Sequence, residues 1–149
     1  MKFRAPIGFV FRWCTDHGPG DAKIEGAEYA RRVISRSKGH VVYEDLATTP
    51  NGWWWNHWTV TLRPPDAWHG ECLGNYRNWV TDYRLRGTPN GGTELTLTGK
   101  RTPTGLGIGG PRVTRAKIET SLRADWAKFS RSLEGDYQTS LRRRRIRSG

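Results

Sequence analysis

Two pairs of cysteine and histidine are the residues of this sequence best suited to hold a metal ion. Two residues separate Cys14 from His17, and two separate His69 from Cys72. Together they match the four ligands of a tetrahedral zinc site. Residues three apart in an extended strand point to opposite faces, however, so His69 and Cys72 can share an ion only where their strand bends. We therefore expect no metal site and two free thiols.

A glycine-rich segment carries the second chemical motif. Gly105, Gly107 and Gly110 have the G-x-G-x-x-G spacing of dinucleotide-binding loops. That fold needs a second parallel strand after the helix, ending in an acidic residue, whereas this chain ends in arginines. We therefore expect no nucleotide and no other cofactor. We interpret the three glycines as a flexible gate beside a binding cavity, because glycine gives a loop the backbone freedom that a gate requires.

Catalytic chemistry has little support in the sequence. There is no nucleophile elbow, and the carboxylates near histidines are scattered over several predicted strands. Polar candidates for a pocket are His57, Asp82, Tyr83 and Arg84, of which Asp82 and Arg84 are better explained as solvated strand residues. The sequence predicts no catalytic residue. It leaves open whether a reaction is catalysed and favours a protein that is not an enzyme.

The segment GWWWNHW holds four of the eight tryptophans. In a strand, Trp54, Trp58 and Val60 share one face, while Trp53 and Trp55 share the other. The first set is the more apolar, so we expect it on the inner face of a sheet. Two interpretations stay open: these rings fill a core that is short of aliphatic residues, or they form the wall of a ligand pocket.

The elements that must position these residues are mainly strands. Apolar spacing predicts a helix over Ala5–Thr15 and one helical turn over Asp21–Gly26, after a strand stub at Met1–Arg4. Alternation and turn residues then predict six strands, over Tyr29–Arg36, His40–Ala47, Trp53–Arg63, Trp68–Asn75, Trp79–Arg86 and Thr93–Arg101. These strands form a meander, and so an antiparallel sheet.

One long helix follows the strands. Its apolar residues recur every three or four positions and form one stripe, made of Ile118, Leu122, Trp126, Phe129, Leu133, Tyr137 and Leu141. Only the sheet is large enough to receive this stripe. We therefore predict an α+β fold in which a curved antiparallel sheet of six to seven strands wraps around a long C-terminal helix, with two short helices near the N-terminus.

This order of elements resembles the START-related SRPBCC superfamily, the helix-grip proteins that include polyketide-cyclase-like and birch-pollen-allergen-like domains. The sequence Ala5-Pro6 followed by Phe9-Val10-Phe11 and Thr15-Asp16 is similar to the opening helix of that family, and Val42-Tyr43-Glu44-Asp45 is similar to its third strand. The resemblance implies a cavity between sheet and long helix that holds an apolar ligand. We expect its lining to include Trp54, Trp58, Val60, Trp79, Tyr83, Trp126 and Phe129.

Length and charge complete the expectations. The 149 residues suffice for one domain, which we place at 1–141, followed by a basic tail at 142–149. The formal charge is +11, and five tail arginines leave 11 − 5 = +6 on the domain. The apolar run near the N-terminus is interrupted by Arg4, Pro6, Gly8 and Arg12, so we expect neither a signal peptide nor a membrane span, and a cytoplasmic protein.

Three functions are compatible with these features. The leading one is the binding or carriage of a small hydrophobic molecule, lipid-like, aromatic or polyketide-like. An enzyme of the cyclase or aromatase type would use the same cavity with polar groups inside it. A nucleic-acid-binding protein would use the tail from Arg142 to Arg147 together with Trp53 and Trp55 as stacking platforms. The sequence does not determine the ligand or the oligomeric state.

Overall fold

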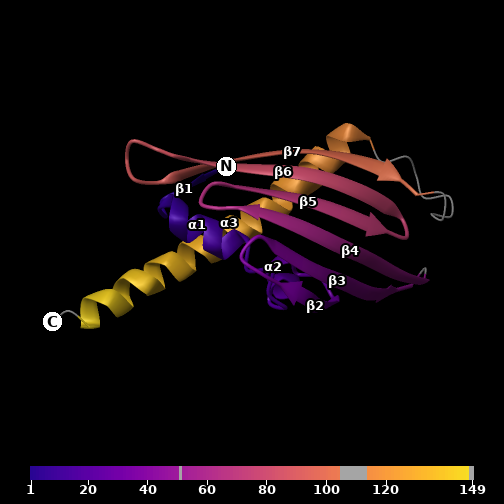
Figure 1. Ribbon diagram of the computed structural model, residues 1–149, viewed down its shortest axis with the longest axis horizontal. Helices are drawn as coiled ribbons and strands as arrows, with labels where there is room; N and C mark the ends of the chain where they lie inside the picture. The colour runs from indigo at the N-terminus through magenta and orange to yellow at the C-terminus, as the bar shows by residue number, and fades with distance from the viewer. Residues whose placement is uncertain (51, 105–113, 148–149) are drawn as a thin grey trace.

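A seven-stranded antiparallel sheet and a long C-terminal helix form the fold (Figure 1). The computed structural model describes residues 1–50, 52–104 and 114–147. Its elements, in chain order, are β1 (Lys2–Phe3), α1 (Ile7–Cys14), α2 (Asp21–Glu25), β2 (Ala30–Arg36), β3 (His40–Thr49), β4 (Gly52–Arg63), β5 (Ala67–Gly74), β6 (Arg77–Gly87), β7 (Thr93–Pro103) and α3 (Arg115–Arg147). The predicted α+β helix-grip architecture is confirmed.

The strands follow one another in the sheet as they do in the sequence, except that β1 lies at the far edge beside β7. Lys2 pairs with Glu94 and Phe3 pairs with Thr93, and the N-terminal amino group donates a hydrogen bond of 2.8 Å to the Leu95 carbonyl. The predicted strand stub is therefore a true edge strand. Because a meander needs only short turns, this topology follows directly from the order of the strands.

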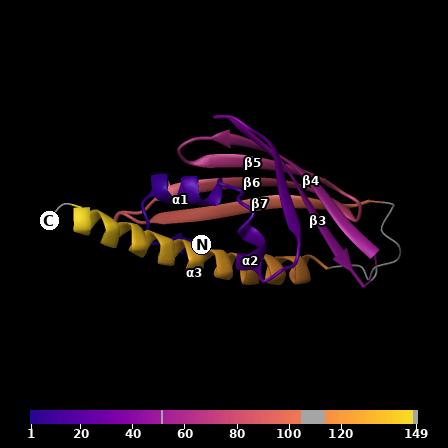
Figure 2. The same ribbon diagram turned by 90° about the horizontal axis from the view of Figure 1, so that it is seen from below.

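The helices all lie on one face of the sheet. Figures 1 and 2 show α3 crossing this face, with α1 and α2 beside it. Pro6 precedes α1 in an extended conformation, and Gly26 ends α2 with φ of 66°, a left-handed value that glycine adopts without strain. We call the face that carries the helices the inner face.

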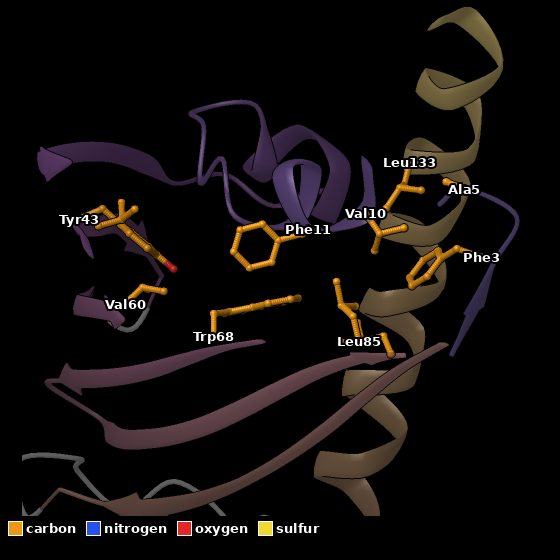
Figure 3. Packing of buried hydrophobic residues seen from close by; sticks show 11 residues of the cluster. Phe3, Ala5, Val10, Phe11, Tyr43, Val60, Trp68, Leu85 and Leu133 are labelled. Carbon is orange, nitrogen blue, oxygen red and sulfur yellow. The ribbon is translucent and has the colours of Figure 1, made fainter. Parts of the chain in front are cut away.

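The buried core gathers where α1 fills the space between the sheet and α3 (Figure 3). Phe11 of α1 contacts Trp68 of β5 edge to face, with ring centroids 6.1 Å apart. Val10 of α1 and Leu133 of α3 are both 0% exposed. The apolar stripe predicted for α3 faces this core, and all seven of its residues are at least partly buried. The short helix therefore closes one end of the interior.

Strand ends agree with the sequence prediction to within two residues. The largest consequence is at β6, which was predicted to begin at Trp79 but begins at Arg77. Arg77 pairs with Pro103, so the ladder between β6 and β7 continues beyond the apolar part of both strands. Charged residues are poor strand signals, since propensity reflects packing, yet backbone pairing extends to them.

Candidate functional site

The tryptophans of β4 divide between the two faces of the sheet. Trp54, Trp58 and Val60 share the inner face, where Val60 is only 2% exposed and Trp58 packs against the core. Trp53 lies on the opposite face and is 56% exposed. Registers of β4 with β3 and β5 are unbroken, so the alternation holds along the paired part of the strand. Trp54 and Trp58 therefore lie on the face of the sheet that carries the helices, where Trp54 contacts Tyr29 and Trp58 contacts Tyr43.

Glycines on β5 give Trp58 and its neighbour Asn56 their places on the inner face. Gly70 is paired with Val60, and a Cβ atom there would lie 2.9 Å from Thr81 Oγ1 and 3.2 Å from the Trp58 ring. At Gly74 a Cβ atom would lie 2.4 Å from Asn56 Oδ1. A side chain at either position would occupy space that the ring or the amide now takes. The inner face of β5 thus accommodates large side chains from β4.

A series of ring contacts joins the sheet to α3. Trp68 and Tyr83 are stacked with centroids 4.6 Å apart, Tyr83 lies 5.9 Å from Trp126, and Trp126 lies 5.7 Å from Phe129. Phe129 also contacts Trp13 of α1 at 6.1 Å. Three of the residues predicted to line the cavity are therefore in contact in series: Tyr83 with Trp126, and Trp126 with Phe129.

Burial is unequal along the inner face. At the end closed by α1, Val10, Val41 and Leu133 are 0% exposed. Trp54 and Trp79, near the other end, point the same way but are only partly buried. We call this the open end of the inner face. Rings of this size expose a large apolar area to solvent when they are left uncovered, so their exposed surface there is a candidate ligand contact.

Two arginines lie beside Trp79 at the open end. Arg77 precedes it by two residues on β6, and Arg101 is its partner on β7. Their guanidinium carbons lie 5.6 and 5.5 Å from the centroid of the Trp79 ring. The Nε atom of Arg77 is buried and has no hydrogen-bond partner in the described part of the chain. Burial and the positive charge of Arg101 lower the pKa of Arg77.

A third inner arginine, Arg31 of β2, is fully paired. Its guanidinium donates two hydrogen bonds to the Asp45 carboxylate, at 2.6 and 2.9 Å, and forms an ion pair with Asp21 of α2. It also lies 4.2 Å from the centroid of the Tyr43 ring. This cluster pairs the buried guanidinium with two carboxylates and ties α2 to the sheet, which indicates a structural role.

Burial holds three ionisable side chains of the interior, Cys72, Tyr83 and His17, in their neutral forms. Burial raises the pKa of Cys72 and of Tyr83 to about 12, so neither is a nucleophile at neutral pH. Burial, together with the charges of Arg31 and Arg36, lowers the pKa of His17 to about 3, which keeps its imidazole neutral. This pattern fits a binding surface better than an acid–base pair.

Three polar candidates from the sequence lie on the outer face instead. His57 is 3.4 Å from a carboxylate oxygen of Glu44, and Asp82 is 2.8 Å from His69. Arg84 is exposed. His57, predicted as a pocket candidate, is therefore wrongly assigned: it follows Asn56 and precedes Trp58, so strand alternation turns it away from α3.

The two faces of β5 separate His69 from Cys72. His69 contacts Asp82 on the outer face, whereas Cys72 is buried on the inner face opposite Trp58 and Trp79. Residues 1–50, 52–104 and 114–147 contain no group of three or more His, Cys, Asp or Glu side chains that could hold a metal ion. The predicted gate glycines Gly105, Gly107 and Gly110 lie outside the described residues.

Two surface hollows lie along α3, and neither is bounded by the inner tryptophans. The first, of about 370 Å³, lies between α2 and α3 and is lined by Lys23, Ile24, Lys128, Arg131 and Ser132. The second, of about 570 Å³, lies between α3 and the N-terminal segment and is lined by Lys2, Arg4, Ser130, Arg131, Glu134, Gly135 and Gln138. Both are basic and open to solvent, so they do not resemble an apolar ligand site.

Sequence reasoning missed Asn56, Thr81 and the arginines at the open end. Asn56 is 8% exposed and Thr81 is 6% exposed, and both lie on the inner face. A signal for Arg77 was present, because two-residue alternation from Tyr83 through Thr81 and Trp79 leads to it. The positive charge of Arg77 nevertheless favoured an exposed position in the sequence analysis.

Among the described residues, no helix has the length and apolar character needed to cross a membrane.

No protein-family model matches the sequence, and no curated protein matches it significantly. Solved structures match it in fold. The Zhui aromatase/cyclase from Streptomyces sp. R1128 superposes with a TM-score of 0.70 at 15% identity, over 95% of this chain and 92% of that one.

Two further structures agree with this result. The di-domain aromatase/cyclase StfQ of the steffimycin biosynthetic pathway matches with a TM-score of 0.69 at 11% identity, over 93% of this chain and 44% of that one. A protein of Thermus thermophilus, TTHA0849, matches with a TM-score of 0.66 at 12% identity, over 94% of both chains. This chain is therefore similar in fold to most of two of these chains and to about half of a two-domain protein.

Proposed function

On the premise that this chain has the helix-grip fold of the aromatase/cyclases, we propose that it binds a small, largely apolar, ring-bearing molecule between the open end of the sheet and α3. The observation that carries this proposal is that Trp54 and Trp79 lie on the inner face and are only partly buried, whereas Val10, Val41 and Leu133 at the α1 end are 0% exposed. A planar ligand covering these rings would bury apolar area that the free protein leaves in contact with solvent.

The wall of the proposed site comes from the residues predicted by the sequence. Trp54, Trp58 and Val60 contribute from β4, and Trp79 and Tyr83 contribute from β6. Trp126 and Phe129 contribute from α3, opposite the sheet. Asn56 and Thr81 add polar groups on the same face, which can orient a ligand that carries oxygen atoms.

Ligand binding is tested by titration calorimetry with neutral planar compounds of two or three fused rings. We expect Trp58→Leu and Trp79→Leu to weaken binding by about tenfold, which corresponds to about 1.4 kcal/mol. Trp53→Leu is the matched control, since it removes an indole from the same strand as Trp58 but from the outer face. Equal weakening in all three variants, or no saturable binding to the wild type, would contradict the proposal.

A cyclase-type activity at the same site is the second candidate. Its support is that two of the structures matched in fold are aromatase/cyclases and that Asn56 and Thr81 lie on the inner face. Mass spectrometry of a bound keto-bearing chain separates the two functions. A mass that stays unchanged on incubation supports binding or carriage, whereas enzyme-dependent loss of water supports ring closure with dehydration.

A further inference from the structure

Two positive charges lie beside one tryptophan ring at the open end of the inner face, without a negative partner among the described residues. Arg101 of β7 is paired with Trp79, and Arg77 lies two residues before Trp79 on β6, so both guanidinium groups flank one ring. They are close enough for the charge of Arg101 to disfavour the charged form of Arg77. Neither forms an ion pair with another described residue.

The remaining sequence supplies no acidic side chain to this pair. Residues 105–113 and residue 51 contain neither Asp nor Glu. The nearby inner residues Cys72 and Trp79 are uncharged, since burial keeps the Cys72 thiol protonated by raising its pKa to about 12. Holding two guanidinium groups together in a partly buried site without a counter-ion is unfavourable. The arrangement is favourable once an anion joins them.

The contrast with Arg31 shows that this chain provides carboxylates where a buried arginine has only a structural role. Arg31 is held by Asp45 and Asp21, and its side chain is 5% exposed. Arg77, by comparison, keeps its buried Nε–H group without an acceptor among the described residues. An N–H donor of this kind, next to a ring that can stack on a ligand, is suited to a planar or tetrahedral oxyanion.

We propose that Arg77 and Arg101 form an oxyanion subsite, so that the ligand is an apolar ring system carrying a carboxylate or phosphate group. The ring system lies against Trp79 and the neighbouring inner tryptophans, and its anionic group lies between the two guanidinium groups. This inference rests on the proposed function, because it assigns the chemical class of the molecule bound at the same face.

The test compares three probes that share one ring system: 2-naphthoate, 2-naphthyl phosphate and the neutral 2-naphthamide. In calorimetry, the wild type is expected to bind at least one of the two anions about tenfold more tightly than the amide, a difference of about 1.4 kcal/mol. The tighter anion identifies the group that the subsite takes. Arg77→Met and Arg101→Met remove the charge but keep an unbranched side chain, and each variant should bind the two anions no more tightly than the amide.

Arg84→Met is the matched control. Arg84 lies on the same strand as Arg77 but is exposed on the outer face, so its substitution should leave the preference intact. Thermal melts of each free variant add a second readout. The melting temperature should rise in Arg77→Met, because an uncompensated buried charge is removed.

A measurement on the wild type keeps the test decisive if a variant does not fold. The Nε–H resonance of Arg77, assigned by its loss in Arg77→Lys, should shift when 2-naphthoate or the phosphate is added and stay in place with the amide. If the amide binds but both anions bind no more tightly, the subsite is wrong and the proposed function stands. If none of the three probes binds, both proposals are wrong.

Discussion

At the residue scale, the inner face is shaped as much by missing side chains as by large ones. Gly70 and Gly74 leave room for the Trp58 ring and the Asn56 amide, and Thr81 fits beside Gly70. Strand glycines of this kind are usually a cost, because they weaken pairing and pack nothing. Here they allow the large side chains of β4 to pack over β5, which has no side chain at these two positions. We therefore expect these positions to be sensitive to a single added methyl group.

Gly70→Ala should lower the free energy of unfolding by about 1–3 kcal/mol, the usual cost of overpacking a filled interior. Its new Cβ atom would lie 2.9 Å from Thr81 Oγ1 and 3.2 Å from the Trp58 ring. Gly87→Ala is the control, since a Cβ atom at Gly87 would meet no atom within 4 Å. Urea unfolding of both variants measures the difference. A loss at Gly87 as large as that at Gly70 would show that crowding is not the cause.

His17 gives the fold a defined pH dependence. Its pKa in the folded protein is about 3, whereas an unfolded histidine titrates near 6.5. The unfolded chain therefore binds a proton that the folded chain does not, so stability is lost as the pH falls below about 6.5. The slope from this residue is about 1.4 kcal/mol per pH unit between roughly pH 6 and pH 4.

Comparison with His17→Asn isolates that slope, because asparagine tolerates the left-handed backbone of His17, whose φ is 44°. Unfolding free energies of both proteins at several pH values are subtracted at each pH. Subtraction also removes the opposite contribution of Glu25, whose pKa burial raises to about 7 and which favours folding at low pH. A difference that does not change with pH would show that His17 titrates normally.

At the scale of elements, α3 has different roles along its length. Its middle, at Leu133, is enclosed by α1 and the sheet, and that side chain is 0% exposed. Trp126 contacts the Tyr83 ring of β6. Leu122 and Ile118 continue the apolar stripe toward the open end, and both are only partly buried. A single apolar stripe thus serves a packed core at one point and the proposed ligand wall at another.

Leu133→Ala should cost about 2–5 kcal/mol of unfolding free energy, as large-to-small changes in a packed core do. Leu122→Ala makes the same change nearer the start of the stripe and should cost clearly less, because part of its side chain is already exposed. Denaturant unfolding distinguishes them. Equal losses would mean that α3 is packed uniformly, which would leave no open end for a ligand.

At the scale of the whole molecule, much of the positive charge lies on the C-terminal end of α3, away from the packed core. Figure 1 shows the last turns of α3 continuing past the sheet, and Arg142–Arg145 on these turns are exposed. Ile146 is 81% exposed there. Five tail arginines account for nearly half of the +11 charge. Positive side chains near a helix C-terminus interact favourably with the helix dipole, so their presence needs no anionic partner.

Deletion of residues 142–149 should therefore leave the melting temperature within a few degrees of that of the full chain. Binding of the full chain to duplex DNA or to RNA should be weak and should vanish at moderate salt, since it depends on counter-ion release from a few contacts. Fluorescence anisotropy against salt concentration measures this. Tight binding that survives both salt and the truncation would support the nucleic-acid function instead.

Local pattern alone was sufficient to predict most of the architecture. Two-residue alternation marks Trp54, Trp58 and Val60 as one face of β4, and a three-to-four-residue repeat marks the stripe of α3, because each period is a property of the backbone. Short turns between successive strands leave few alternatives to a meander. The side of the sheet that packs against α3 then follows from which face is apolar.

Only the tertiary structure determined which side chains from different elements contact one another. Arg31 and Arg77 look alike in the sequence, yet Asp45 and Asp21 neutralise the first, while the second lies beside Trp79 and Arg101 with no carboxylate among the described residues. Partners of a side chain depend on strand register and on the crossing of α3, which bring together residues far apart in the chain. The burial, the ion pairs and the exposed fraction of a side chain all depend on those long-range contacts. Local periodicity in the sequence therefore does not predict them.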